Sequence, residues 1–145
     1  MNICKIHSIN EDMQKEINLL LHELSINLGS IDRDRVNSLL EEGRLTLFAA
    51  TNEDGHLAGM LTLTFCPTLT DDKFWIEDVI VHNEFRGQGI GKALVRAAVD
   101  YVKESGQPYR IYLTSNPSRT AARNLYRSEG FEEYNTGVFR LQSKH

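Results

Sequence analysis

Three closely spaced glycines between two basic residues form the segment of this sequence best suited to bind an anion. The run reads Arg86, Gly87, Gln88, Gly89, Ile90, Gly91, Lys92. Glycine lets the backbone turn tightly and approach a ligand closely. The helix expected after the run has no Ser, Thr, Asp or Asn at its start to cap it. Its first N–H groups and its dipole are therefore available to a phosphate.

Two common phosphate-binding loops do not fit this run. A Walker loop requires glycine at the position of Arg86, and the dinucleotide-binding fingerprint requires its third glycine where Leu94 stands. The pattern that remains is R-x-x-G-x-G. An ordinary strand-to-helix turn is the alternative, but such a turn does not need this density of glycines.

Two titratable side chains stand at positions suited to acid–base chemistry. Glu77 alternates with Val79 and Val81 along an apolar strand, so its carboxylate should line a cleft that raises its pKa toward that of a general base. Asp78 should point the other way. Tyr126 lies on the apolar stripe of a late helix, one turn before its end. The alternatives are a paired structural carboxylate for Glu77 and a core tyrosine for Tyr126.

Hydrophobic periodicity predicts the elements that must position these residues. Strands are expected over residues 2–7, 44–51, 56–65, 73–82 and 110–114, helices over 13–24, 36–40, 89–104 and 118–129, and two short strands between Phe131 and Leu141. The order is β-α-α-β-β-β-α-β-α-β-β, an α/β fold with a mixed sheet flanked by helices. No repeat or linker marks a boundary, so residues 1–145 are expected to form a single domain.

Composition argues against several classes of protein. The 145 residues are 41% hydrophobic and 25% charged, which is ordinary for a globular domain. No apolar run approaches the roughly 18 residues of a membrane helix, and the first residues lack the apolar segment of a secretory signal. The five histidines and two cysteines lack metal-ligand spacing, so no metal is expected. A cytoplasmic protein is the expectation.

Charge is divided unevenly along the chain. Residues 1–85 contain 6 Lys/Arg and 15 Asp/Glu, a net charge of −9, and residues 86–145 contain 10 and 5, a net charge of +5. The overall charge of −4 argues against generic nucleic-acid binding. The division would serve a cationic ligand near the first part and an anionic ligand near the second. Uneven solvated faces are the simpler alternative.

In its second half the sequence resembles the GCN5-related N-acetyltransferases (GNAT family). Residues 74–82, followed by residues 86–91, are similar to the central strand and pyrophosphate loop of that family. Asn116-Pro117-Ser118-Arg119, Ala121-Ala122, Leu125-Tyr126 and Gly130-Phe131 resemble its C-terminal half. The resemblance implies a splayed sheet and acetyl-coenzyme A (acetyl-CoA) as the acetyl donor.

The resemblance also implies roles for individual residues. The pantetheine arm would lie between the strands at 74–82 and 110–114, and the pyrophosphate would lie on the glycine loop. The implied cofactor-binding residues are Val79, Ile80, Val81, Arg86, Gly87, Gln88, Gly89, Ile90, Gly91, Lys92 and Asn116. For Asn116, a turn before Pro117 is an equal alternative. Tyr126 would protonate the leaving thiolate, and Glu77 would deprotonate the acceptor ammonium.

The implied reaction is direct transfer of the acetyl group to a primary amine. The first two helices, the loops at 25–35 and 67–72 and the final hairpin would contact the acceptor. The acidic first part favours a cationic small molecule or a peptide or protein amine, with no nucleic-acid or membrane partner. A homodimer stays open. A non-catalytic acyl-CoA-binding sensor or partner domain is the alternative, although the presence of both Tyr126 and Glu77 argues against it.

Overall fold

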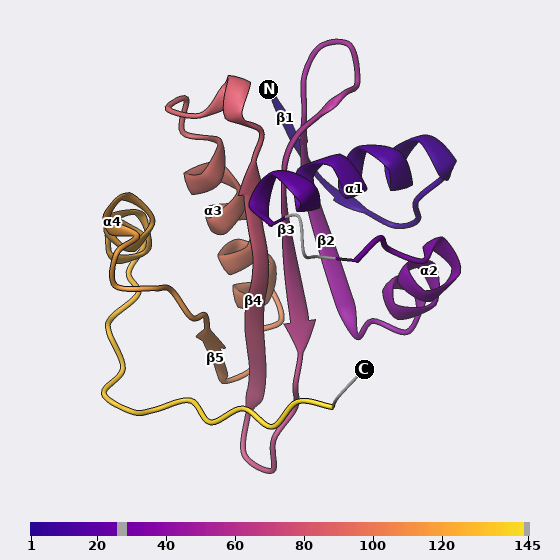
Figure 1. The fold of residues 1–145 in the computed structure, drawn as a ribbon. Coiled ribbons are helices and arrows are strands. Elements are labelled where there is room, and N and C mark those ends of the chain that lie inside the picture. The colour runs from indigo at the N-terminus through magenta and orange to yellow at the C-terminus, as the bar shows by residue number, and fades with distance from the viewer. Residues whose placement is uncertain (26–28, 144–145) are drawn as a thin grey trace.

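Five strands form one open sheet in the computed structural model, which describes residues 1–25 and 29–143. The strands are β1 (Asn2–Ile6), β2 (Leu45–Thr51), β3 (Leu57–Phe65), β4 (Asp72–Val81) and β5 (Tyr109–Tyr112). They lie in the order β1-β2-β3-β4-β5, antiparallel from β1 to β4 and parallel between β4 and β5 (Figure 1). The sheet is therefore mixed, as the sequence predicts.

Helices cover both faces of this sheet. They are α1 (Glu11–Leu24), α2 (Arg33–Glu41), α3 (Ile90–Lys103) and α4 (Thr120–Ser128), with a short 3₁₀ turn, η1 (Asn83–Phe85), before the glycine loop. Side-chain caps fix the starts of the first two helices, because Asn10 accepts from the Met13 amide and Asp32 accepts from the Asp34 amide. The α1 and α2 helices lie on one face and α3 on the other (Figure 1).

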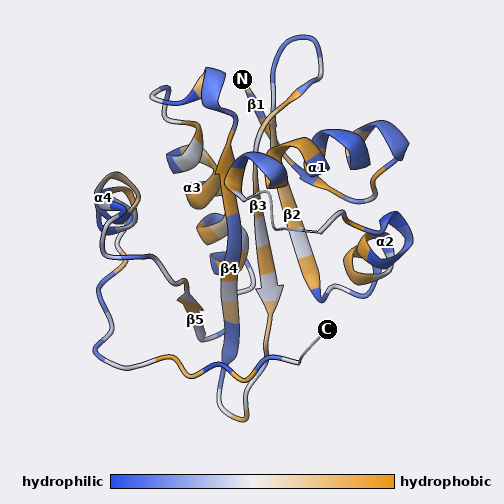
Figure 2. Ribbon diagram, viewed as in Figure 1, coloured by the Kyte–Doolittle hydropathy of each residue, from blue (hydrophilic) through white to orange (hydrophobic). Residues whose placement is uncertain are grey.

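Each face of the sheet has its own apolar core. The α1 residues Ile17, Leu20 and Leu21 pack with Met60 and Ile80 on one face. On the opposite face, the buried residues of α3 pack against the alternate strand positions; they are Ile90, Leu94, Val95, Ala98 and Val102 with Phe48, Leu61, Leu63 and Ile76. Apolar segments accordingly gather where α1 and α3 meet the sheet, while the outward turns of α1 and α2 are hydrophilic (Figure 2).

The β4 and β5 strands pair over a short stretch only. Asp72 to Trp75 pair with Tyr109 to Tyr112, after which β5 ends while β4 continues to Val81. On this side, the second half of β4 therefore has no strand partner in the described part of the chain. This divergence of two parallel strands is the splay that the family resemblance implies.

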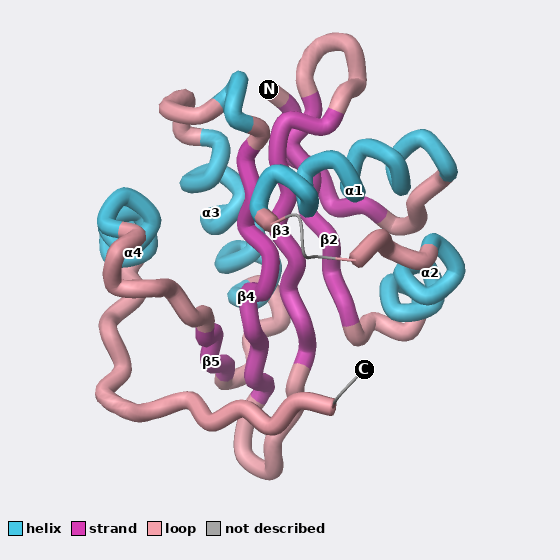
Figure 3. The backbone as a smooth tube through the Cα atoms, in the orientation of Figure 1, coloured by secondary structure: helices cyan, strands magenta, loops and turns pink. Residues whose placement is uncertain are grey.

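The two strands predicted between Phe131 and Leu141 do not form, and this part of the prediction is wrong for the described residues. The stretch from residue 131 to 143 runs as loop after α4 (Figure 3). Phe139 and Leu141 are fully exposed, so the alternation of apolar residues has neither a core nor a partner strand beneath it. Alternation favours a strand only where another strand completes its hydrogen bonds. The remaining predicted elements are confirmed, with shifts of a few residues at their ends.

Candidate active site

The glycine loop joins β4 to α3 through two left-handed backbone positions. Gly87 has φ 80° and Gly89 has φ 78°, values that residues with a Cβ rarely adopt. Gly89 is also the N-cap of α3, and no side chain of the described residues caps the start of that helix. The predicted uncapped helix start is confirmed, which leaves the amides of the first turn available to an anion.

The third glycine of the loop marks a close approach rather than a special backbone angle. A Cβ at Gly91 would lie 3.4 Å from Leu125 Cδ1 and 3.7 Å from Val81 Cγ2. The start of α3, the end of β4 and the middle of α4 therefore converge on Gly91. A side chain larger than a methyl group at this position would fill the space between the three elements.

Arg86 is turned back toward β4. Its Nε donates a hydrogen bond of 3.2 Å to the carbonyl oxygen of Val81. This bond fixes the loop against the strand end and keeps a guanidinium beside the glycines. It also occupies one of the backbone groups that the sequence assigns to the pantetheine arm. Gln88 of the same loop and Lys92 in the first turn of α3 are both exposed.

A β-bulge interrupts β4 at its two carboxylates. Leu63 of β3 pairs with Ile76, but Leu61 pairs with Val79, so Glu77 and Asp78 together oppose the single β3 residue between these pairs. Ile76 and Val79 consequently share the face that packs on α3. The strict alternation on which the sequence placed Glu77 with Val79, and Asp78 opposite, is wrong for this stretch, because the extra residue breaks the period of two between Ile76 and Val79.

The two carboxylates differ in their surroundings. Glu77 is exposed, yet partial burial raises the pKa of its carboxyl group, and the charge of Asp78 adds to the effect. Asp78 is half-buried and bonds to the Thr62 hydroxyl, with 2.8 Å between Thr62 Oγ1 and Asp78 Oδ2. The direction of the Glu77 shift is the one expected of a general base, although its side chain does not lie in an enclosed cleft.

Tyr126 is the buried aromatic residue of α4. Its side chain is 8% exposed and packs edge-to-face on Phe131, with ring centroids 6.1 Å apart. Burial raises the pKa of its phenol, while the charge of Arg119 acts in the opposite direction. In the described part of the chain no residue hydrogen-bonds its hydroxyl. The phenol is therefore protonated at neutral pH and has a proton to donate.

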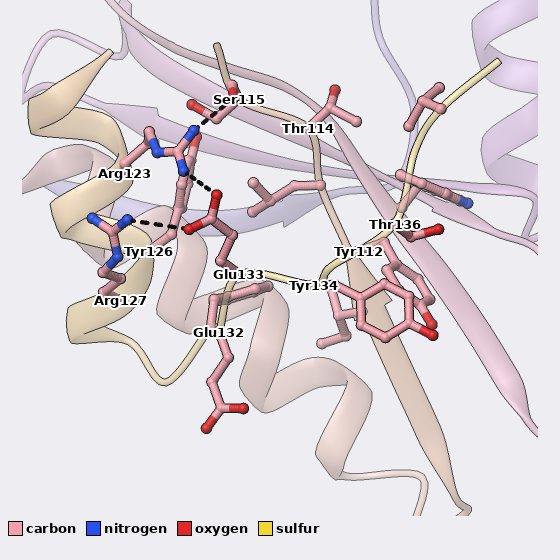
Figure 4. Close-up of a pocket in the computed structure, with 15 residues that line it drawn as sticks. Tyr112, Thr114, Ser115, Arg123, Tyr126, Arg127, Glu132, Glu133, Tyr134 and Thr136 are labelled. Atoms are coloured by element: carbon pink, nitrogen blue, oxygen red, sulfur yellow. Dashed lines mark hydrogen bonds and ion pairs between the residues drawn. The ribbon is translucent and has the colours of Figure 1, made fainter. Parts of the chain in front are cut away.

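A cavity of about 320 Å³ extends from Tyr126 along β5 to the C-terminal loop. Figure 4 shows Arg123 and Arg127 of α4 directed at Glu133 on one side and the rings of Tyr112 and Tyr134 on the other. Arg123 lies 2.8 Å from the Glu133 carboxylate and also donates to the Ser115 carbonyl oxygen at 3.3 Å. The sequence interpretation missed these residues, although arginines every fourth position at 119, 123 and 127 mark one helix face.

Asn116 forms the turn that was the alternative to cofactor binding. Its Oδ1 accepts from both the amide and the hydroxyl of Ser118, at 3.0 and 2.9 Å. In the residues that the structure describes, its Nδ2 donates no hydrogen bond. The turn therefore does not exclude a bond from Nδ2 to a bound ligand.

Residues 1–25 and 29–143 contain no group of three His, Cys, Asp or Glu side chains placed to hold a metal ion. Within the same residues, no helix is both long enough and apolar enough to cross a membrane. Of the acceptor loop predicted at 25–35, residues 26–28 lie outside the described residues.

The sequence of the chain matches that of a known protein family. Residues 13–131 match the family described as "Acetyltransferase (GNAT) family". This match covers more than half of the chain, so the protein belongs to the GNAT family, as the glycine loop and the C-terminal motifs predict.

Individual relatives share part of the sequence or the whole fold. The chain is 35% identical over 78 residues to human N-acetyltransferase 8B, covering 54% of this chain and 34% of that protein. It is 32% identical over 91 residues to streptothricin acetyltransferase of Streptomyces lavendulae, covering 63% and 47%. The chain thus spans less than half the length of these relatives.

A solved structure shows the same fold over nearly the whole chain. It is an aminoglycoside acetyltransferase from an uncultured soil metagenomic sample in complex with trehalose, with a TM-score of 0.85 and 21% identity, and the match covers 99% of this chain and 96% of that one. The splayed sheet and its flanking helices are therefore the GNAT fold.

Proposed function

We propose that residues 1–145 act as one acetyltransferase domain that transfers an acetyl group from acetyl-CoA to a primary amine. One observation carries this proposal: the open edge of β4 leads directly into the uncapped start of α3. Among residues 1–25 and 29–143, none pairs as a strand with the second half of β4 on one side, and this half leads through Gly87 and Gly89 into α3. An amide-bearing arm can pair with the open edge of β4, while a pyrophosphate binds the uncapped start of α3.

The proposed donor site follows these two features. The pyrophosphate binds the backbone amides between Gln88 and Lys92, with the Arg86 guanidinium beside it. The pantetheine arm lies along Val79 to Val81, and the Nδ2 of Asn116 is available to its carbonyl groups. The convergence at Gly91 supports this placement, because a side chain larger than a methyl group would fill the space between β4, α3 and α4.

The proposed chemistry needs one base and one acid. Glu77 takes a proton from the acceptor ammonium, and the resulting amine nitrogen attacks the thioester carbonyl carbon. The carbon–sulfur bond then breaks, and Tyr126 gives its proton to the departing thiolate. The products are an acetylated amine and the free thiol of coenzyme A. No bond to the enzyme forms, and backbone amides along β4 polarise the carbonyl group.

The proposed acceptor is a cationic small molecule or a peptide or protein amine. The net charge of −9 in residues 1–85 supports this class, because those residues form α1, α2 and the β3–β4 turn. Two similar proteins, a streptothricin acetyltransferase and an aminoglycoside acetyltransferase, agree with an amine-bearing acceptor.

A thiol-release assay over a panel of amines tests the proposal. Acetyl-CoA should raise the melting temperature of the protein, since it binds the native state. At least one amine should then release the thiol in proportion to acetylated product. Stabilisation without thiol release from any amine would instead support the non-catalytic sensor. Absence of stabilisation would contradict the donor site itself.

A further inference from the structure

One hydroxyl group spans the bulge in β4. The Thr62 Oγ1 donates a hydrogen bond to Asp78 Oδ2 at 2.8 Å and accepts one from the backbone N–H of Asp78 at 3.1 Å. A bulge leaves an extra residue outside the strand ladder, where its amide needs another partner. Thr62 supplies that partner and holds the side chain of the same residue.

Few side chains can perform both tasks at this position. A hydroxyl group is at once a donor and an acceptor, whereas a methyl group of the same size is neither. Threonine is also branched at Cβ, which restricts χ1 and directs the hydroxyl group. Thr62 is 8% exposed, so solvent has little access to replace its bonds.

We propose that Thr62 and Asp78 form a clasp that positions Glu77 for proton abstraction and sets the path of β4 toward the donor thioester. Both are positioning residues, since neither is placed against a substrate. The clasp fixes the bulge, and the bulge sets the direction of the adjacent Glu77 side chain. The inference deepens the proposed function and rests on it for the role of Glu77.

Asp78 acts on Glu77 by charge as well as by position. Burial and the charge of Asp78 are the two causes that raise the pKa of Glu77. Thr62, which lies across the bulge from Glu77 on β3, carries no charge. Trp75 and Ile76, which precede Glu77 on β4, carry none either. Asp78→Asn keeps an oxygen that can accept the Thr62 hydrogen bond and removes the charge. The variant therefore separates the two contributions.

The kinetic test compares hydroxyl and methyl groups at matched positions. Thr62→Val should lower kcat by about tenfold to a hundredfold, the effect of losing hydrogen bonds to a charged group, while acetyl-CoA affinity changes little. Thr62→Ser should restore kcat. Thr64→Val is the matched control, because Thr64 Oγ1 donates to the Trp75 carbonyl oxygen at 3.2 Å outside the bulge. Equal kcat values for Thr62→Val and the wild type would overturn the clasp.

The pH profile gives a readout that a purely structural role would not move. Asp78→Asn should shift the acidic limb of kcat/KM to lower pH, because Glu77 loses the negative charge that holds its proton. Its plateau should stay near the wild-type value. An acidic limb that stays in place would show that Asp78 does not act on Glu77.

Amide hydrogen exchange tests the clasp without any acceptor. The Asp78 amide should be protected in the wild type and in Thr62→Ser, and should exchange faster in Thr62→Val while amides of β1 keep their protection. Unchanged protection at Asp78 would refute the clasp even if an amine is acetylated. Faster exchange in a protein that acetylates no amine would leave the clasp standing and remove the proposed function.

Discussion

The two edges of β4 have opposite roles. Toward β3, the strand is paired along nearly its whole length and is interrupted only at the bulge. Toward β5, it is paired over four residues and then open. The same backbone thus anchors the core on one side and offers unpaired groups to a ligand on the other. The pairing with β3 holds β4 in place, so the edge toward β5 can stay open without losing its position in the sheet.

The largest expected effect is on acetyl-CoA binding, and it comes from substitution of a glycine in the loop that follows the open edge of β4. Gly89→Val places a branched residue at φ 78°, where a Cβ costs about 1–2 kcal/mol, and should abolish the stabilisation of the protein by acetyl-CoA. Gly43→Val is the matched control, because Gly43 has φ 72° in a turn outside the proposed donor site. Both variants should lose stability, as thermal unfolding measures, but only Gly89→Val should lose binding by titration calorimetry. Equal loss of affinity in both would remove the loop from the donor site.

Removal of the proposed acid should have the next largest effect. Tyr126→Phe should lower kcat by about 10²–10⁴-fold, because a single proton donor is lost from a ring that stays buried. Affinity for acetyl-CoA should change little. Tyr101→Phe is the control, since Tyr101 of α3 packs on Phe48 of β2 rather than on α4. Wild-type kcat in Tyr126→Phe would show that the tyrosine is a core residue.

The carboxylate of Glu77, at the bulge on the paired side of β4, gives a prediction about the pH dependence of kcat/KM. The proposed mechanism requires ionised Glu77, and the pKa of its carboxyl group is raised, so kcat/KM should rise with pH through a limb above the ordinary range of glutamate. Glu77→Gln should abolish that limb and lower kcat/KM. The variant should also be slightly more stable than the wild type at neutral pH. A group whose folded pKa is raised loses stability as pH rises through that pKa, and glutamine has no charge to bury.

The smallest expected effect concerns the acceptor. If the acidic first part of the chain attracts a cation, kcat/KM for a cationic amine should fall severalfold as salt rises, because the Debye length shortens from about 30 Å at 0.01 M to about 3 Å at 1 M. A neutral amine of similar size serves as the control. Salt-independent turnover of the cationic amine, or a preference for an anionic one, would contradict the electrostatic argument and leave acetyl transfer intact.

What the sequence could predict is local in origin. The glycine loop was recognisable because left-handed backbone angles and an absent cap depend on residues next to one another. Helices and strands followed from periodicity for the same reason. GNAT membership followed from the order and spacing of two motifs. The match of residues 13–131 to the GNAT family confirms it.

What the sequence could not predict depends on pairing between distant segments. The bulge is a property of the register between β3 and β4, and neither strand reveals it alone. The loop after α4 has the alternation of a strand, but the described residues offer it no partner. The ion pair between Arg123 and Glu133 likewise forms only once α4 and that loop lie side by side.

Because of the bulge, β4 should tolerate the deletion of one residue, which in an ordinary strand would invert the faces of all later side chains. Losing one residue from a strand normally turns every later side chain to the opposite face. Here Ile76 and Val79 stand three positions apart and both pack toward α3. If either of the two residues between them were deleted, the pair would stand two positions apart, as in a regular ladder. A chain with one residue fewer would keep the alternation of its core positions but would carry one carboxylate in place of two adjacent ones.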